Sequence, residues 1–342
     1  MPELSIIIPV ADEFETFENT LVSVLENRPS DCEVIVVRDE RYTDPYSIGD
    51  EVTFVEASRE VGLVERIALG VGASRAELVH TLGSGVQVTE RWTESALTHF
   101  HRPRVGAVVP LVVDQCRPRR TVAAGATLTA GGRRQLERRL PRNTASAHET
   151  ERAATLTAAF FRKSAYQLVG GLDPVVGNVL ADVDLAARLR HAGYLTVIEP
   201  EAILTHAGPL RDAIASDGRC EERLFLRNAP TFGWGPALGK HPLAIAWRLL
   251  ARPLPWQVAR DLGGRLAAWA EIGRMREHHR KLASICGLAT TMGEPVSVSN
   301  AAAVATSAPE EELPHDAVLT IESHRPSNRR LPSGHSRHCR AA

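Results

Sequence analysis

The chain has 342 residues, enough for one large domain or two of ordinary size. Hydrophobic residues make up 44% and charged residues 24%, which is typical of a soluble globular protein, and the net charge of -1 gives no basic footprint for nucleic acid. Five scattered cysteines without CxxC spacing argue against a zinc motif or a disulfide framework and favour a reducing, cytoplasmic compartment. The sequence shows neither a secretory leader nor an apolar run long enough to cross a bilayer, so we expect a soluble or peripheral protein.

The first hundred residues alternate short apolar runs with amphipathic segments. Buried strands are expected at residues 4–10, 32–37, 52–55 and 78–82, and helices at 15–26 and 64–74. This alternation predicts a doubly wound α/β sheet. Ligands bind such sheets at the carboxyl ends of the strands, so the loops after Pro9, Val37 and Leu82 are the ones expected to form a site.

The middle of the chain contains a basic tract between two further strands. The strands are expected at residues 105–110 and 158–163. The tract at 117–142 carries three Arg-Arg pairs but no aromatic residue for stacking on bases, so we interpret it as a solvated insertion. Its arginines could touch an anionic acceptor or a diphosphate.

The segment Gly170–His206 contains a turn, a helix and a strand. Paired glycines and Asp-Pro indicate the turn, and the helix is expected to begin near Asp182, with Leu185 and Leu189 on its buried face. Gly193 ends this helix, and a strand at 195–198 follows, which Pro200 is expected to end. Asp182 and Asp184 either cap the helix or carry chemistry.

The C-terminal third changes in composition. Helices are expected at 221–228, 241–252 and 255–280, and the last two interleave tryptophan and leucine with arginine. That pattern fits either an interfacial membrane contact or packing onto the rest of the protein. From residue 288 onward the composition predicts disorder.

Several of these segments together resemble family 2 glycosyltransferases of the GT-A fold. The resemblance is carried by Ser5–Val10, by Val36-Val37-Arg38-Asp39 with Thr43-Asp44, and by the segment Gly170–His206. In that last segment the matching residues are Gly170, Gly171, Leu172, Asp173, Asp182, Asp184, Leu185, Arg188, Ala192, Gly193, Tyr194, Pro200 and His206.

The sequence departs from the family pattern at three places. Ala181 replaces a glutamate, and Arg38 replaces an acid. Gly83-Ser84-Gly85 stands where the family carries the Asp-x-Asp that holds a divalent metal. The glycines offer no side-chain ligand, so Mg²⁺ or Mn²⁺ would be held poorly. His206 is the remaining candidate ligand for such a metal. The Gly-Ser-Gly turn either presents N–H groups to a phosphate or is an ordinary loop.

The resemblance implies roles for particular residues. Asp182 would be the general base, and Asp184 and Arg188 would contact the acceptor or support the residues that do. Asp39 would hold the base or ribose, unless it only satisfies its own turn. The residues expected at the nucleotide-sugar are Pro9, Val10, Asp39, Gly83, Ser84 and Gly85.

The function implied is transfer of a sugar, with inversion, from a nucleotide-diphosphate sugar to an acceptor hydroxyl. The acceptor would be a glycan or a lipid-linked molecule, in polysaccharide or glycoconjugate biosynthesis of the cell envelope, with possible contact at the inner face of the membrane. The competing hypothesis is an inactive relative that binds a nucleotide sugar or a partner enzyme. We expect a GT-A-like domain at 1–209, a helical C-terminal region at 210–287 and a disordered tail at 288–342.

Overall fold

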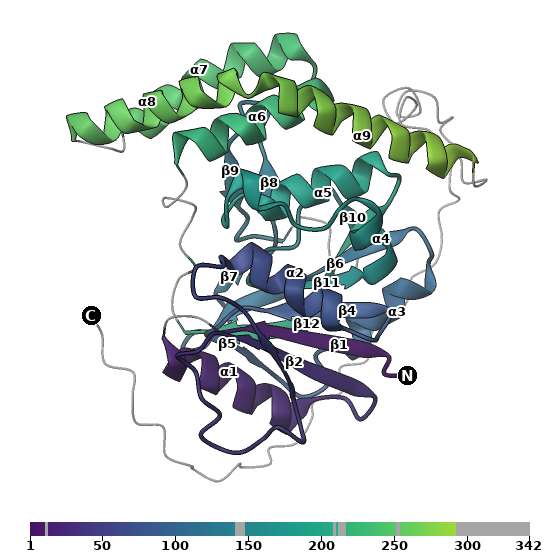
Figure 1. Ribbon diagram of the computed structural model, residues 1–342. Coiled ribbons are helices and arrows are strands. Elements are labelled where there is room, and N and C mark those ends of the chain that lie inside the picture. Colours follow the sequence, from purple (N-terminus) through teal and green to yellow (C-terminus); the bar gives the residue numbers. More distant parts are fainter. Residues whose placement is uncertain (11–12, 141–147, 208–209, 211–216, 251–253, 292–342) are drawn as a thin grey trace, which may run out of the picture. The chain divides into compact units, whose positions relative to one another are not determined.

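Figure 1 shows a computed structural model of the chain, which describes residues 1–10, 13–140, 148–207, 210, 217–250 and 254–291. The described residues all belong to one compact unit, and residues 295–342 lie outside the described part of the chain. The disorder predicted for the tail beyond residue 291 therefore also lies outside it. The predicted division at residue 209 stays a prediction.

A mixed sheet forms the centre of this unit. Its strands run in the order β10-β12-β6-β11-β4-β1-β2-β3, with β5 paired to β12 and β7 to β6. The neighbours β3, β2, β1 and β4 are parallel, whereas β11 is antiparallel to both β4 and β6. The strands are β1 (Leu4–Pro9), β2 (Cys32–Arg38), β3 (Thr53–Glu56), β4 (Leu78–Leu82), β5 (Val86–Val88), β6 (Val105–Asp114), β7 (Thr121–Ala123), β10 (His148–Thr150), β11 (Ala158–Arg162) and β12 (Leu195–His206).

Helices pack on both faces of this sheet because its central strands are apolar on both sides. Ile6 and Ile8 of β1 pack in one core with α1, whereas Ile7 between them packs in a second core with α2 and α5. The helices of this part are α1 (Phe14–Asn27), α2 (Leu63–Ala73), α3 (Glu94–Thr98), α4 (Lys163–Leu168) and α5 (Ala181–His191).

A two-stranded hairpin and four further helices complete the described residues. The hairpin consists of β8 (Ala126–Leu128) and β9 (Arg134–Leu136). The helices are α6 (Gly218–Phe232), α7 (Trp234–Leu250), α8 (Pro255–Ala270) and α9 (Ile272–Thr291). The predicted α/β class with a helical C-terminal extension is thus confirmed, although α9 makes residues 288–291 helical rather than disordered.

Two local predictions were wrong. Pro200 does not end its strand, because β12 continues to His206 through an irregularity between Glu199 and Ile203, where a missing N–H donor is tolerated. The basic tract is not simply a solvated insertion, since it contributes β7, β8 and β9, and residues 122–124 are buried.

Candidate functional site

A cavity of about 540 Å³ opens at the carboxyl ends of β1 and β4. Its size lies within the range of small-molecule sites, and strand ends are where α/β sheets bind ligands. It is lined by Pro9, Val10, Arg41, Arg59, Val61, Gly62, Leu63, Arg66, Gly83, Ser84, Arg134, Leu156, Thr157, Asn178, Val179, Asp182, His206 and Leu210.

The structure brings most of the sequence-predicted site residues to this cavity. Residues from four separate segments of the chain line it together: Pro9, Val10, Gly83, Ser84, Asp182 and His206. Gly85 is not among the described lining residues, but a side chain at this position would lie 3.2 Å from Nε2 of His206. The His206 ring therefore lies against the place that the second carboxylate of an Asp-x-Asp motif would need.

Asp182 is held by an arginine that the sequence did not single out. Nε of Arg134, on β9, donates to Oδ1 of Asp182 at 2.9 Å, and Nη2 donates to Oδ2 at 2.7 Å. The backbone N–H of Val183 also donates to Oδ1, at 2.7 Å. The Arg134 side chain is 7% exposed and that of Asp182 is fully buried. Asp182 therefore lies in the first turn of α5 and also forms a buried ion pair with Arg134.

Asp39 lies behind two other arginines of the cavity. Its carboxylate accepts from Arg41 and from Arg66, at 2.6 and 2.8 Å, and is buried. The hydrogen bonds from Arg41, joined by those from Arg66, hold the pKa of Asp39 well below its usual range although burial opposes them. Asp39 is not among the described lining residues, so what it contributes there is the orientation of Arg41 and Arg66.

Asp184 and Arg188 lie in a buried ion cluster apart from the cavity lining. Nε of Arg188 donates to Asp184 at 3.0 Å, and Arg227 of α6 donates to the same oxygen at 3.2 Å. Arg188 also donates to the carbonyl of Val169 at 2.6 Å. Arg188 is only 4% exposed, so it is buried together with Leu185 and Leu189 of the same helix. The cluster ties α5 to α6.

The described residues do not fit a divalent metal in the cavity. No group of three or more His, Cys, Asp or Glu side chains that could hold a metal ion occurs among them. Asp182 is engaged by Arg134, and the hydroxyl of Ser84 donates to the carbonyl of Pro9 at 3.3 Å. Hard cations need several oxygen ligands, and this donor set does not offer them.

The charged groups that line the cavity are instead mostly arginines. Among the described lining residues, four arginines face a single carboxylate, that of Asp182. The arginines come from three places: Arg41 follows β2, Arg59 and Arg66 flank the start of α2, and Arg134 is on the hairpin. Planar guanidinium groups suit phosphate and carboxylate oxygens, so the cavity is built for an anion.

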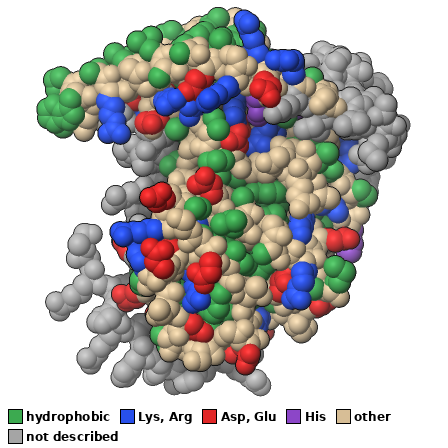
Figure 2. Space-filling model, in the orientation of Figure 1, with side chains coloured by type: hydrophobic (Ala, Val, Ile, Leu, Met, Phe, Trp, Pro, Cys, Tyr) green, Lys and Arg blue, Asp and Glu red, His purple; other side chains and the backbone are tan. Residues whose placement is uncertain are grey.

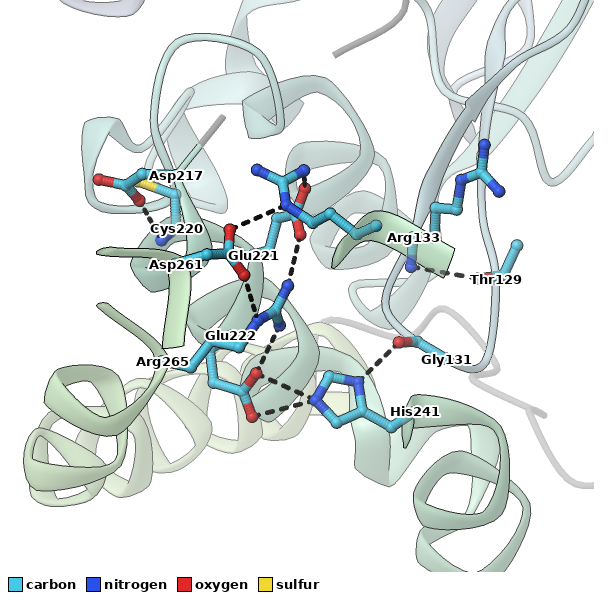
Figure 3. A network of polar contacts seen from close by, with 11 residues as sticks. Thr129, Gly131, Arg133, Asp217, Cys220, Glu221, Glu222, His241, Asp261 and Arg265 are labelled. Atoms are coloured by element: carbon cyan, nitrogen blue, oxygen red, sulfur yellow. Dashed lines mark hydrogen bonds and ion pairs between the residues drawn. The ribbon is translucent and has the colours of Figure 1, made fainter. Parts of the chain in front are cut away.

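The tip of the β8–β9 hairpin is fixed by α6 and α7, as Figure 3 shows. Nδ1 of His241 lies 2.8 Å from the carbonyl oxygen of Gly131, and its Nε2 lies 3.0 Å from both oxygens of Glu222. Gly132 has φ +84° and packs on Phe225, where a Cβ would lie 2.8 Å away. These contacts fix the backbone that leads into Arg134.

Sequence reasoning missed Arg134 because its partner lies 48 residues further along the chain. A signal was present nevertheless. The pair Gly131-Gly132 lies in a short connection between two segments of alternating apolar and polar residues, which is typical of a hairpin. Recognising this hairpin would have predicted that the arginines of this stretch lie on ordered strands rather than in a solvated insertion.

Comparison with known proteins gives three relevant matches. Residues 5–169 match the model of the family described as "Glycosyl transferase family 2". The polypeptide N-acetylgalactosaminyltransferase 12 of Mus musculus is 32% identical over 123 residues, which are 33% of this chain and 21% of that protein. The pre-mycofactocin glycosyltransferase of Mycobacterium tuberculosis is 30% identical over 203 residues, which are 58% of this chain and 37% of that protein. The chain therefore aligns with about a fifth of the length of the first curated relative and little more than a third of the second.

Among solved structures, the crystal structure of GalNAc-T7 with UDP, GalNAc and Mn²⁺ is similar, with a TM-score of 0.55 and 14% sequence identity. The match covers 81% of this chain and 55% of that one. At this identity the likeness concerns the fold, and it confirms the GT-A-like architecture expected from the sequence.

Proposed function

We propose that the chain, whose residues 5–169 match the model of family 2 glycosyltransferases, is itself such an enzyme. It would transfer a sugar from a nucleotide-diphosphate sugar to an acceptor hydroxyl with inversion. The observation that carries this proposal is the cavity itself. It combines one carboxylate, Asp182, with four arginines at the strand ends where α/β folds bind ligands. Nucleotide sugars present a diphosphate to such a cavity and a reactive anomeric carbon beside it.

The residues take complementary parts in the proposed reaction. The acceptor oxygen forms a bond to the anomeric carbon while the bond from that carbon to the diphosphate oxygen breaks, and the electron pair leaves with the diphosphate. The acceptor proton passes to the carboxylate of Asp182, which acts as general base. The positive charge that the leaving diphosphate needs comes from the arginines. Asp39 supports this by orienting Arg41 and Arg66.

The proposal is tested by replacing Asp182 with asparagine, which keeps the size and one acceptor oxygen but cannot take the proton. With UDP-, GDP- and dTDP-sugars as donors and simple glycosides as acceptors, turnover is expected to fall about 10²–10⁴-fold, the usual contribution of a positioned general base. Asp184→Asn is the matched control on the same helix, and it should cost far less turnover in the folded fraction. Unchanged turnover in Asp182→Asn would end the assignment of the base. Absence of transfer by the wild type from any nucleotide sugar it binds would favour an inactive relative.

We also propose that α7 and α8 contact an anionic membrane surface. Figure 2 shows hydrophobic side chains gathered along these helices, and Trp247 and Trp256 are 63% and 66% exposed. The acidic residue of the two described helices, Asp261, is buried and pairs with Arg248 and Arg265. Exposed tryptophan and leucine, on two helices whose described acidic residue is buried in ion pairs, fit the headgroup region of anionic lipid. No described helix is long and apolar enough to span a bilayer.

The membrane proposal places the acceptor at the cytoplasmic face of the membrane, as a lipid-linked molecule or growing glycan. Flotation with phosphatidylglycerol vesicles tests it, with phosphatidylcholine vesicles as the comparison. We expect binding to the anionic vesicles that falls when Trp247 and Trp256 are both changed to alanine. Equal recovery of the wild type and this double variant with both lipids would contradict it.

A further inference from the structure

The Arg134–Asp182 ion pair presents a problem for the proposed reaction, on which this inference rests. Both oxygens of Asp182 accept hydrogen bonds from Arg134. A carboxylate held in this way does not present its oxygens to an acceptor hydroxyl. The pair therefore has to open, or at least loosen, before Asp182 takes a proton.

The cavity provides a reason for it to open. Arg134 and Asp182 both line it, so an anion in the cavity can reach the guanidinium. A diphosphate offers the same paired oxygens as a carboxylate and more negative charge, and guanidinium groups bind it through the same fork of N–H donors. Arg41 and Arg66 pair with Asp39, which is not among the described lining residues, whereas the partner of Arg134 lines the cavity itself.

The hairpin limits the movement to the Arg134 side chain. Its tip is held by His241 and packs on Phe225, and its strands pair through Ala126–Leu136 and Leu128–Arg134. The backbone at Arg134 is thus fixed by contacts on α6 and α7. The long arginine side chain retains the torsions needed to move from one anion to another.

We propose that Arg134 is a counter-ion that changes partner when the donor binds. Before binding it holds Asp182, and in the donor complex its guanidinium contacts the diphosphate. The exchange releases the Asp182 carboxylate for the acceptor proton only when a donor is present. It also supplies the leaving group with a positive charge where the Asp-x-Asp carboxylates are absent.

The proposal makes a prediction that a purely structural ion pair does not make. If Asp182 and the diphosphate compete for Arg134, removing the Asp182 charge should strengthen diphosphate binding. The removal should have no such effect once Arg134 is also changed. Calorimetry with UDP, GDP and dTDP in EDTA measures this on the wild type, Asp182→Asn, Arg134→Gln and the double variant.

We expect Arg134→Gln to weaken binding of the cognate nucleoside diphosphate about tenfold or more, the effect of losing a charged hydrogen bond. The nucleoside monophosphate should be affected less. Asp182→Asn should tighten diphosphate binding several-fold in the Arg134 background and leave it unchanged in the Arg134→Gln background. Arg134→Lys keeps the charge without the fork and should lie between wild type and Arg134→Gln.

Three outcomes overturn the proposal: Asp182→Asn binds diphosphate no tighter than wild type, Arg134→Gln binds it equally well, or wild type binds none of the three diphosphates. Melting curves verify the fold of each variant. If Arg134→Gln alone does not fold, Arg134→Lys and the double variant, which leaves no unpaired charge, decide the question. Sugar transfer by a wild type that lacks the coupling would overturn the exchange and keep the proposed function. Coupling without transfer would do the reverse.

Discussion

Two buried ion clusters of this chain have similar chemistry and different surroundings. In the cavity, Arg134 pairs with Asp182, and both line a space that a ligand can enter. Between α6, α7 and α8, Glu222 accepts from His241, Arg265 and Trp269, and none of these is among the residues that line the cavity. In the proposed exchange the first pair gives up its partner to a ligand, whereas the second is a contact that the fold either keeps or loses. Access, rather than burial, separates a cluster that serves a ligand from one that holds the fold.

The cluster around Glu222 should therefore show the larger stability effect. Burial opposes ionisation of Glu222, but the hydrogen bonds and charges of His241 and Arg265 outweigh it and hold its pKa below the ordinary value. Glu222→Ala removes the acceptor that buried His241, Arg265 and Trp269 share, while Arg265 keeps its pairs with Asp261 and Glu221. The free energy of unfolding should therefore fall by about 3 kcal/mol.

Urea denaturation of Glu222→Ala beside Asp182→Ala checks this difference. Asp182→Ala should lose less stability, because water in the cavity can solvate Arg134. An equal or larger loss in Asp182→Ala would contradict the comparison.

Gly132→Ala should affect both clusters, because the hairpin tip lies between them. The alanine Cβ would meet Phe225 at 2.8 Å, and the backbone at φ +84° disfavours any side chain. We expect a loss of about 1–3 kcal/mol in unfolding free energy from strain and overpacking. Because the hairpin tip would shift, binding of nucleoside diphosphate should weaken as well.

Gly72→Ala is the matched control for this variant. Gly72 lies in α2 with open space around its Cβ position, so alanine should stabilise the helix by up to about 1 kcal/mol. If Gly132→Ala lowers stability without any change in diphosphate affinity, the hairpin tip does not position Arg134.

His80 represents a third kind of burial, without any charged partner. It stacks on Phe160, its Nδ1 donates to the carbonyl of Ala159 at 3.0 Å, and burial lowers its pKa to about 3. The unfolded chain takes up this proton below about pH 6.5 while the native protein does not, so stability falls as the pH falls from 6.5 toward 3. Between pH 6.5 and 5.5 His80 should account for about 1 kcal/mol of the loss.

Denaturation curves of wild type and His80→Gln across this interval measure that contribution. His80→Gln should show the shallower pH dependence. His101→Gln, at an exposed histidine, is the control and should follow the wild type. Parallel curves for His80→Gln and wild type would contradict the assignment.

The sequence predicted what depends on local pattern. The alternation of Ile6, Ile7 and Ile8 between two cores is visible in a continuous apolar run, and the ends of β1 and β4 did prove to line the cavity. It did not predict Arg134 at Asp182, because that contact depends on how a hairpin lies on α6 and α7. It also failed at Pro200, where the ladder irregularity that tolerates proline depends on the neighbouring strand β6.

Asp39 shows the same limit of sequence prediction, because its position was predicted but its partners were not. Its place after β2 was predicted, and a nucleotide contact was the function that the resemblance implied. The structure gives it two arginine partners, one of which, Arg66, lies 27 residues further along the chain. A motif locates a residue on an element, but its role depends on which side chains the tertiary structure brings to it.

The smallest effect is expected from divalent metal, and it tests the source of charge in the cavity. Gly83 and Gly85 offer no carboxylate, and the described residues contain no group of three metal-ligating side chains. Four arginines line the same cavity, so the charge that a diphosphate needs is already present. Calorimetry with the cognate nucleoside diphosphate, first in EDTA and then in excess Mg²⁺ or Mn²⁺, should show affinities that differ by less than about tenfold, or 1.4 kcal/mol. A hundredfold requirement for metal, about 2.7 kcal/mol, would show that ligands outside this set hold a cation. It would also remove the need for Arg134 as the counter-ion of the leaving group.

The double variant Gly83→Asp with Gly85→Asp sharpens this test. His206 lies against position 85, and the arginines of the cavity would pair with any new carboxylate. We expect this double variant to bind diphosphate more weakly in EDTA than the wild type does.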